Sequence, residues 1–363
     1  MVNPIKIREY REGDEKQILN LRQTVFGDLD PVRLKKSTWL WQFRHNPAGE
    51  AFCALAEDHG IVVGQYTVIP TRFSVQGDET LFAFSCDTMI HPEYRKQGMF
   101  TALARKVYRL IESRHGINTV WGFPNEISLP GFTRSLNWKL LTVFPLRVIP
   151  LRPLAMFYPY LPFKKRFRQN QQGMDDSSSS EISNSGVRFP DVPGLLVEPI
   201  TRFDAEFDKL WDRNRDIAPV IQVRNTAYLN WRYFGVSEFG YRAFAIRFDG
   251  TLSGYMVIRM MGLRGHFFGV LADLFPFPVR DRSMTRRLFL FARNYCKTQG
   301  AEFMTCLISR SDPSLFKEVG LRKIPAIFNP KKWYFGCRYP QNDRAVLGSP
   351  KNWYLTYGDT DIA

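Results

Sequence analysis

The chain has 363 residues, which is longer than one hydrophobic core usually serves, so its length favours two domains. Its formal charge is +15, from 50 Lys and Arg against 35 Asp and Glu, and this favours a polyanionic partner: a nucleotide cofactor, anionic lipid, nucleic acid or an acidic glycan. The five cysteines include no CxxC pair, which argues against a disulfide framework or a zinc cluster and favours a reducing cytoplasm.

No secretory signal is expected, because the N-terminus MVNPIKIREYREGDE has no apolar core behind a basic start. The longest apolar region, residues 140–163, is interrupted by prolines and arginines, which argues against a membrane-spanning helix. A basic cluster, residues 164–168, follows it. Two interpretations stay open: peripheral contact with an anionic membrane, or an edge strand followed by a solvated linker.

Strands and helices are predicted to alternate through the first half of the chain. β-Branched and apolar runs bounded by turn residues indicate the strands, and apolar residues at helical spacing indicate the helices. The predicted order is strand 5–9, helix 14–27, helix 31–46, strands 51–58 and 61–69 joined at His59-Gly60, strand 80–90, a helix from Phe100, strand 117–123, helix 128–136 and an extended segment 139–149.

The second half repeats the first after a polar, Ser-rich stretch. Residues 169–190 have almost no aliphatic side chains, so they predict a flexible linker. Corresponding residues then recur at a nearly constant offset: Gly60 and Gly250, Trp41 and Trp231, Asp87 and Asp273, Asn137 and Gly320. We therefore expect a second copy of the same fold. The expected domains are residues 1–163 and 195–363, with the linker at 164–194.

A basic loop with one glycine, Arg95-Lys96-Gln97-Gly98-Met99-Phe100, joins the strand at 80–90 to the following helix. Such a loop presents unpaired backbone N–H groups and the positive end of the helix dipole. It therefore predicts a site for an anion such as a pyrophosphate, and hence a phosphorylated ligand. The alternative is an ordinary strand-to-helix connection, because a single glycine is not specific.

The sequence pattern of this loop resembles motif A of the GNAT-type acetyltransferase superfamily. The pattern is Ile90-x-Pro92-x-x-Arg95-x-x-Gly98 before a helix. In that family the loop holds the pyrophosphate of acetyl-CoA. Phe100 stands where that family usually has Gly or Ala. The resemblance implies an α/β fold of two tandem GNAT-like domains, each a mixed, mostly antiparallel sheet flanked by helices. The predicted order of strands and helices agrees with a complete GNAT fold.

The resemblance also implies which residues hold acetyl-CoA, with no metal. Backbone groups of the motif strand would meet the pantetheine arm and face the thioester carbonyl, the loop would hold the pyrophosphate, and two polar residues after the next strand would touch the cofactor. The residues at these positions are Met89, Ile90, Arg95, Lys96, Gln97, Gly98, Met99, Phe100, Thr101, Asn125 and Ser128. Asn125 and Ser128 have a second interpretation, as the cap and turn of the short helix.

Attack of an amine on a thioester needs a base for the amine and an acid for the departing thiolate. Asp87 and His91 are the candidate bases. Asp87 has an alternative structural role, because the second half keeps Asp273 at its place, and His91 can equally be an exposed loop residue. The family's Tyr acid is replaced by Phe132 or Thr133, so water or another Tyr would supply the proton, or the protein does not catalyse.

The second copy departs from the motif. Its loop, residues 276–283, has no glycine and two prolines, which cannot donate an N–H. We therefore expect one competent site in the first half and a degenerate second half. Trp39, Trp41, Tyr228, Trp231 and Tyr233 are candidates for an acceptor cleft or for the core. In the C-terminal tail, Asp359 or Asp361 could face a cationic amine, or the tail could simply fray.

These features predict an acetyl-CoA-dependent N-acetyltransferase that acts on a primary amine of a small molecule, with an amino sugar as one candidate. The alternatives are an acyl-CoA-binding or scaffold protein that has lost catalysis and a Fem-type aminoacyl-tRNA-dependent transferase. The intact pyrophosphate loop argues against the Fem-type enzyme, which needs no CoA site. Nucleic acid is not an expected partner, and the expected compartment is the cytoplasm.

Overall fold

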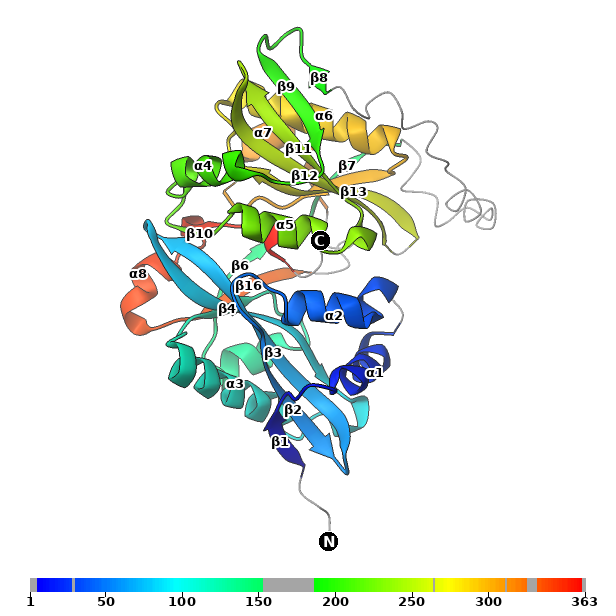
Figure 1. Cartoon of the computed structure of the whole chain (residues 1–363), viewed down its shortest axis with the longest axis vertical. Coiled ribbons are helices and arrows are strands. Elements are labelled where there is room, and N and C mark those ends of the chain that lie inside the picture. Colours follow the sequence, from blue (N-terminus) through cyan, green and yellow to red (C-terminus); the bar gives the residue numbers. More distant parts are fainter. Residues whose placement is uncertain are drawn as a thin grey trace. The chain divides into compact units, whose positions relative to one another are not determined.

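The structure is a computed structural model that describes residues 5–27, 30–152, 186–263, 265–310, 312–324 and 332–360. The described residues group into two compact units (Figure 1). Unit 1 consists of Met1–Phe144, Ala218–Val223 and Lys331–Tyr354, and unit 2 of Pro145–Ile217, Arg224–Pro330 and Leu355–Ala363. Each unit therefore combines segments from both halves of the sequence.

Unit 1 contains a nine-stranded sheet in its described residues, and its main path has the order β1-β2-β3-β4-β5-β16-β6, with β10 pairing β3 and β17. The strands are β1 Lys6–Glu9, β2 Phe52–Asp58, β3 Ile61–Val75, β4 Asp78–Ile90, β5 Val120–Gly122, β6 Lys139–Phe144, β10 Val220–Gln222, β16 Trp333–Arg338 and β17 Trp353–Tyr354. The helices are α1 Glu15–Phe26, α2 Lys36–Phe43, α3 Met99–His115 and α8 Arg344–Leu347, with short turns η1 Pro31–Leu34, η2 Pro92–Tyr94, η3 Gly131–Ser135, η8 Gln341–Asp343 and η9 Pro350–Asn352.

Helix α3 covers one face of this sheet, while α1 and α2 lie on the other (Figure 1). The apolar residues of α3 recur at helical spacing, so one stripe of this helix is buried. Leu103, Ala104 and Val107 pack there against Tyr66 and Val68 of β3. This core fixes the position of the first turn of α3, which continues directly from the basic loop.

Unit 2 has an eight-stranded sheet in its described residues, in the order β15-β7-β14-β13-β12-β11-β9-β8. The strands are β7 Arg147–Pro150, β8 Val187–Arg188, β9 Leu195–Ile200, β11 Tyr241–Phe248, β12 Thr251–Leu263, β13 His266–Phe275, β14 Phe303–Cys306 and β15 Arg322–Lys323. The helices are α4 Ala205–Asn214, α5 Thr226–Phe234, α6 Arg282–Thr298 and α7 Pro313–Glu318, with η6 Ser237–Phe239 and η10 Tyr357–Asp359.

The two sheets share one plan, which confirms the expected α/β class of two mostly antiparallel, mixed sheets flanked by helices. On the main path of each sheet one parallel pair, β4 with β5 or β13 with β14, interrupts the antiparallel order, and β10 pairs with β17 in parallel beside the path of unit 1. In each sheet a register shift also falls at the matching place, opposite Asp87 in unit 1 and beside Asp273 in unit 2. The second copy expected from the sequence repeats therefore has the same strand pairing as the first.

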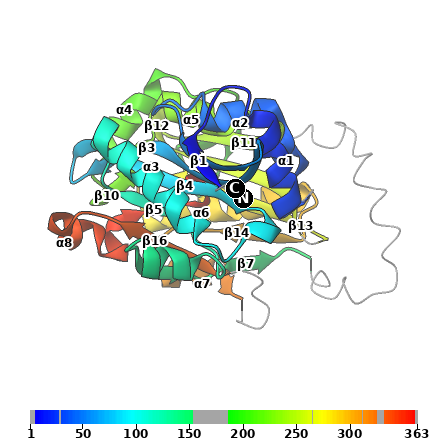
Figure 2. The same cartoon turned by 90° about the horizontal axis from the view of Figure 1, so that it is seen from below.

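The segment 139–149 differs from its prediction as one extended piece. It divides near Pro145 into β6, which belongs to the sheet of unit 1, and β7, which belongs to the sheet of unit 2. Strand β16, from late in the chain, pairs with β5, beside which Figure 2 shows it, and also with β6. The units are thus interleaved along the sequence, whereas the expected domains at 1–163 and 195–363 are contiguous.

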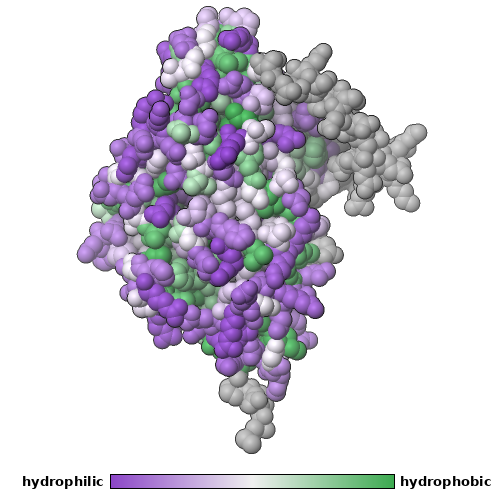
Figure 3. All heavy atoms as spheres, viewed as in Figure 1, coloured by the Kyte–Doolittle hydropathy of each residue, from purple (hydrophilic) through white to green (hydrophobic). Residues whose placement is uncertain are grey.

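None of the described helices is long and apolar enough to cross a membrane. On the face shown in Figure 3, hydrophobic residues occur in small groups among hydrophilic ones. The basic cluster at 164–168, on which the prediction of membrane contact rests, lies outside the described residues, so that contact stays a prediction.

Candidate active site

The N-terminus of α3 is open. Gly98 is its N-cap residue in the left-handed conformation, with φ of 75°, and no side chain caps the helix among the described residues. A Cβ placed on Gly98 would meet no described atom within 4 Å. The first N–H groups of a helix have no partner inside the helix, so the amides of Met99 to Thr101 are available to an anion.

The basic residues of the loop lie directly before this helix. Arg95 and Lys96 are exposed, and the Nε of Arg95 donates to the carbonyl oxygen of Ile90 at 3.2 Å. Lys96 has φ of 64°, a conformation that non-glycine residues seldom adopt. Gln97 bonds back to the carbonyl of Glu93 at 3.4 Å. The loop therefore brings two cations to the positive end of the α3 dipole.

The corresponding helix of unit 2, α6, closes its own N-terminus. Asp281 is the N-cap, and its carboxylate accepts from the backbone N–H of Met284 at 2.8 Å. The hydroxyl of Thr285 accepts from the N–H of Val279 at 2.9 Å. These bonds occupy donors that an anion would need, and the Asp281 carboxylate would repel it. The structure therefore agrees with the expected degeneracy of the second loop.

Strand β4 extends beyond the end of its parallel partner, β5. The pairing of β4 with β5 ends at Ser85 and Gly122, whereas β4 continues to Ile90. On its other edge, Met89 pairs with Gln65 and Ile90 with Gly64 of β3. The outer edge of Met89 and Ile90 therefore has no strand partner among the described residues. Backbone donors and acceptors on such an edge are available to an extended ligand.

Asp87 lies at an irregular point of β4. Its φ is 47°, and the register shift between Gln65 and Thr67 of β3 falls opposite it. Its carboxylate forms an ion pair with Arg22 of α1, with both side chains largely buried. Its carbonyl oxygen accepts from the Nε2 of Gln65 at 3.0 Å. These contacts agree with the structural role that the sequence left open for Asp87.

His91 follows β4 directly and is half-buried. Its backbone N–H donates to the carbonyl of Val63 at 2.8 Å, and its ring lies edge-on to Tyr94, with 5.7 Å between ring centroids. Its Nδ1 is buried and has no hydrogen-bond partner among the described residues. Of the two candidate bases, His91 therefore has fewer side-chain bonds to other described residues.

Phe100 turns its ring toward the core. The ring lies 5.1 Å from Phe132 and 5.9 Å from Tyr66, measured between centroids, and it rests against Gly131, where a Cβ would come within 2.7 Å of it. The ring thus fills space beside α3, while the Phe100 amide stays in the first turn. Met99 is buried beside Gly64 in the same way, and Thr101 is half-buried.

Asn125 and Ser128 bond to each other. The N–H of Ser128 donates to the Asn125 side chain at 2.9 Å, and the N–H of Asn125 donates to the Ser128 hydroxyl at 3.1 Å. This reciprocal pattern caps the turn that leads into η3, as the alternative interpretation expected. Their assignment to a cofactor stays a prediction.

The family model for the acetyltransferase (GNAT) domain matches residues 6–141. Residues 6–141 form a GNAT acetyltransferase domain. The resemblance stated for the motif loop is therefore confirmed for this part of the chain, and the domain is of the acyl-CoA N-acyltransferase type. Its matched range holds the open helix and every predicted site residue.

Solved structures show the same fold over nearly the whole chain. A probable N-acyltransferase from Enterococcus faecalis has a TM-score of 0.63 and 10% identity over 95% of this chain and 75% of its own. A GCN5-related N-acetyltransferase from Anabaena variabilis has a TM-score of 0.60 and 15% identity over 95% of this chain and 75% of its own. Saccharomyces cerevisiae N-myristoyltransferase, solved with bound myristoyl-CoA, has a TM-score of 0.60 and 11% identity over 93% of this chain and 79% of its own. No curated sequence matches significantly.

A chain of hydrogen-bonded side chains, which was not predicted from the sequence, crosses the core of the GNAT domain. The Ser85 hydroxyl donates to Tyr66 at 2.9 Å, the hydroxyls of Tyr66 and Tyr108 lie 2.8 Å apart, and Trp138 Nε1 donates to Tyr108 at 2.9 Å. Burial raises the pKa of Tyr108 to about 12, so its hydroxyl stays protonated at neutral pH. The only sequence signal was a Tyr on the apolar stripe of α3.

The tail is docked in unit 2, so Asp359 is not offered to an amine. Its carboxylate is 5% exposed and meets Arg224 at 2.8 Å, and Arg224 also lies 3.4 Å from Asp273. Burial raises the pKa of Asp359, against the opposing effect of Arg224. Asp361 lies outside the described residues. Of the proposed cleft aromatics, Trp39, Trp41 and Tyr233 are buried, and Tyr228 and Trp231 are half-buried.

Proposed function

We propose that the protein transfers an acetyl group from acetyl-CoA to a primary amine of a small molecule, with amino sugars as the first acceptors to test. The open N-terminus of α3 carries the proposal. Its amides and two adjacent cations form an anion site, whereas the equivalent helix α6 is capped by Asp281. The match of residues 6–141 to the GNAT acetyltransferase domain supports the same reaction class.

The residues fit a CoA pyrophosphate. Arg95 and Lys96 would meet its charge, and the amides of the first turn, from Gly98 to Thr101, would donate to its oxygens. Gln97 lies within the same loop, and the unpaired edge of β4 at Met89 and Ile90 would pair with the amide groups of an extended arm. Acetyl-CoA supplies the activated acyl group. Asn125 and Ser128 would contact the donor from the turn after β5.

For the proton of the acceptor amine we propose His91 or Asp87. The unpartnered Nδ1 of His91 favours His91 as the direct acceptor, and the ion pair with Arg22 favours a positioning role for Asp87 at the bulge. Replacing His91 with Ala is expected to lower kcat by roughly 10² to 10⁴. An unchanged kcat would rule out this role.

Calorimetric titration tests the donor site. We expect acetyl-CoA and CoA to bind, and pantetheine, which lacks the pyrophosphate, to bind far more weakly. Arg95→Gln is expected to weaken CoA binding roughly tenfold through the loss of a charged contact. Arg105→Gln, within α3 and with only a 3.5 Å bond to the Ser135 carbonyl, is the matched control. Equal affinity for CoA and pantetheine would contradict the proposal.

A second candidate is an acyl-CoA-binding protein without transferase activity. Phe132 or Thr133 stands where the family carries its Tyr acid, Phe132 is buried in the core, and Asp87 is engaged by Arg22. Thiol release across a panel of amines separates the two functions, because a binding protein would saturate with acetyl-CoA and release no thiol above the uncatalysed rate. All five cysteines are buried and none forms a disulfide, which supports the reducing, cytoplasmic setting that we propose.

A further inference from the structure

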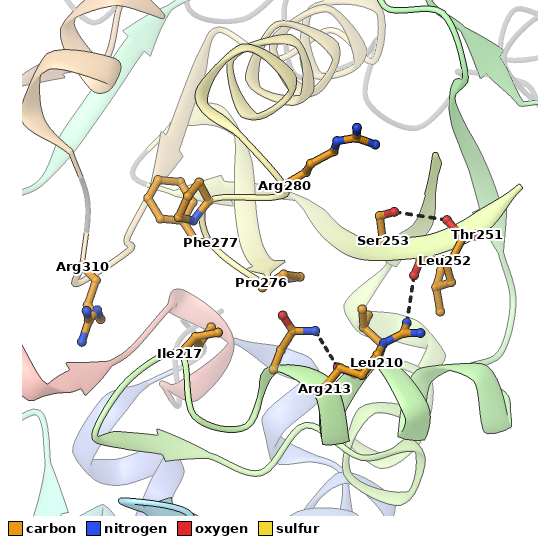
Figure 4. Close-up of a pocket in the computed structure, with 12 residues that line it drawn as sticks. Leu210, Arg213, Ile217, Thr251, Leu252, Ser253, Pro276, Phe277, Arg280 and Arg310 are labelled. Carbon is orange, nitrogen blue, oxygen red and sulfur yellow. Dashed lines mark hydrogen bonds between the residues drawn. The ribbon is translucent and has the colours of Figure 1, made fainter. Parts of the chain in front are cut away.

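Unit 2 contains a cavity of about 660 Å³ that is unrelated to the α3 loop. Its lining comes from α4, from the start of β12, from the loop after β13 and from Arg310 after β14 (Figure 4). The twelve lining residues include three arginines, Arg213, Arg280 and Arg310, and no carboxylate. This volume lies within the range of small-molecule sites, and the charge of the lining selects an anion.

Two of these arginines are held in place. The Nη2 of Arg213 donates to the carbonyl oxygen of Leu252 at 3.1 Å, which leaves the rest of its guanidinium fork for a ligand (Figure 4). The guanidinium of Arg280 stacks on Phe248, with 3.6 Å from Cζ to the ring centroid. Arg280 also has φ of 57°, a costly conformation for a residue with a side chain. Such fixed cations lose little freedom on binding.

The remaining lining supplies an apolar surface with one polar group. Phe277 and Pro276 lie between the arginines, together with Ile217 from the segment after α4 (Figure 4). The Nδ2 of Asn214 donates to the Leu210 carbonyl at 2.8 Å, so its oxygen is left to accept from a ligand. A ligand that matches this lining carries an anionic group on an apolar body.

Recognition here would differ from recognition at α3. The loop beside the cavity contains Pro276 and Pro278, which have no N–H, and the first turn of α6 is capped by Asp281. Backbone amides therefore contribute little, and guanidinium side chains would do the binding. Such groups pair with a single carboxylate or phosphate in a bidentate manner.

We propose that this cavity binds a small organic anion, whose carboxylate or phosphate group pairs with Arg213 in the positive field of Arg280 and Arg310 while its apolar ring or chain lies against Phe277. The site is separate from acyl-donor binding and does not depend on the proposed transferase activity.

Calorimetric titration of the full chain at low salt tests the proposal with phenyl phosphate, benzoate, inorganic phosphate and benzyl alcohol. Phenyl phosphate or benzoate is expected to bind saturably, at least tenfold more tightly than inorganic phosphate and benzyl alcohol, because only they carry both groups. Which of the two binds more tightly identifies the anionic group. Absence of saturable binding, or binding of benzyl alcohol as tight as that of phenyl phosphate, would overturn the proposal.

Variants assign the binding to this cavity. Arg213→Gln is expected to weaken binding of the anion roughly tenfold, as the loss of one charged contact does, and Arg280→Gln to weaken it less, because it removes positive charge without a direct contact. Lys209→Gln is the matched control, because Lys209 is an exposed cation on α4 outside the lining. Arg95→Gln tests the α3 loop as the source of the signal. An unchanged affinity in both cavity variants, or its loss in Arg95→Gln, would place the site elsewhere; thermal unfolding checks that each variant is folded.

Discussion

Asp87 shows how a residue with a catalytic pattern can serve structure. It lies at the bulge of β4 with a left-handed backbone, and its carboxylate is fixed by Arg22 of α1. A largely buried charge that loses its partner is destabilising, because its desolvation is no longer compensated. The pair therefore joins α1 to the strand that carries Met89 and Ile90.

We expect Asp87→Asn to lower the free energy of unfolding by about 2–4 kcal/mol, because it leaves Arg22 without its counter-charge. Removing both charges with Arg22→Met and Asp87→Asn together should cost less than the sum of the single changes. Urea unfolding of the four proteins measures this coupling.

The ion pair of Arg44 and Glu50, with exposed fractions of 32% and 59%, provides the control. Glu50→Gln should change stability by less than about 1 kcal/mol, as for surface pairs. Additive effects of the Arg22 and Asp87 substitutions would show that the ion pair does not stabilise the bulge. The hypothesis that Asp87 is the direct base would then be favoured again.

At the scale of elements, the corner between β1 and α1 is a charged network. Arg8 of β1 contacts Asp14 with two nitrogens, at 2.6 and 2.8 Å, and Glu57 of β2 at 2.6 Å. Burial tends to raise the pKa of Asp14, but the bonds from Arg8 and from the Arg11 N–H outweigh it and lower the pKa. The pKa of Glu15 is lowered in the same way, against burial, by Tyr10 and nearby donors.

This corner should make the GNAT domain sensitive to acid. A carboxylate whose pKa is lowered on folding stabilises the protein above its unfolded value, near pH 4, and the stabilisation is lost as pH falls toward the folded pKa. We expect Asp14→Asn to be less stable at pH 7 and to show a flatter decline between pH 5 and pH 3.

Urea midpoints across this pH range measure the effect. Asp78→Asn, at the exposed first residue of β4, is the control and should keep the slope of the unmodified protein. A slope unchanged by Asp14→Asn would show that acid unfolding begins elsewhere.

Local features of these elements were predictable, because they depend on neighbours in the sequence. His59-Gly60 predicted the hairpin of β2 and β3, and the glycine in a basic loop predicted the open start of α3. The contact of Arg22 with Asp87 was not predictable, since it joins residues far apart in sequence. It was also not predictable which of the two sheets contains residues 147–150, because an apolar strand has the same sequence pattern in either sheet.

At the scale of the whole molecule, the interleaving of strands decides which fragments fold. The sheet of unit 1 needs β16 and β17, whose residues Phe335 and Trp353 are fully buried around Trp121. A fragment of residues 1–194 lacks both strands and also β10. Its sheet would expose an open edge and part of its aromatic core.

We therefore expect residues 1–194 alone to lack a cooperative unfolding transition. The full chain, cut at a protease site placed within 164–194, should keep both pieces together and retain its Trp fluorescence. Thermal unfolding of the two samples at equal concentration measures the difference. A sharp transition in the isolated fragment would instead support the contiguous domains expected from the sequence.

Because β16 lies between β5 and β6, the ribosome releases the middle of this sheet almost last. At about 5–20 residues per second, roughly ten to forty seconds separate the synthesis of Phe144 from that of Arg338. Throughout that delay the nascent chain holds β6 without its strand partner and β5 with one open edge beside β4. Biogenesis of this protein should therefore rely on holding factors that shield those strands until translation is nearly finished.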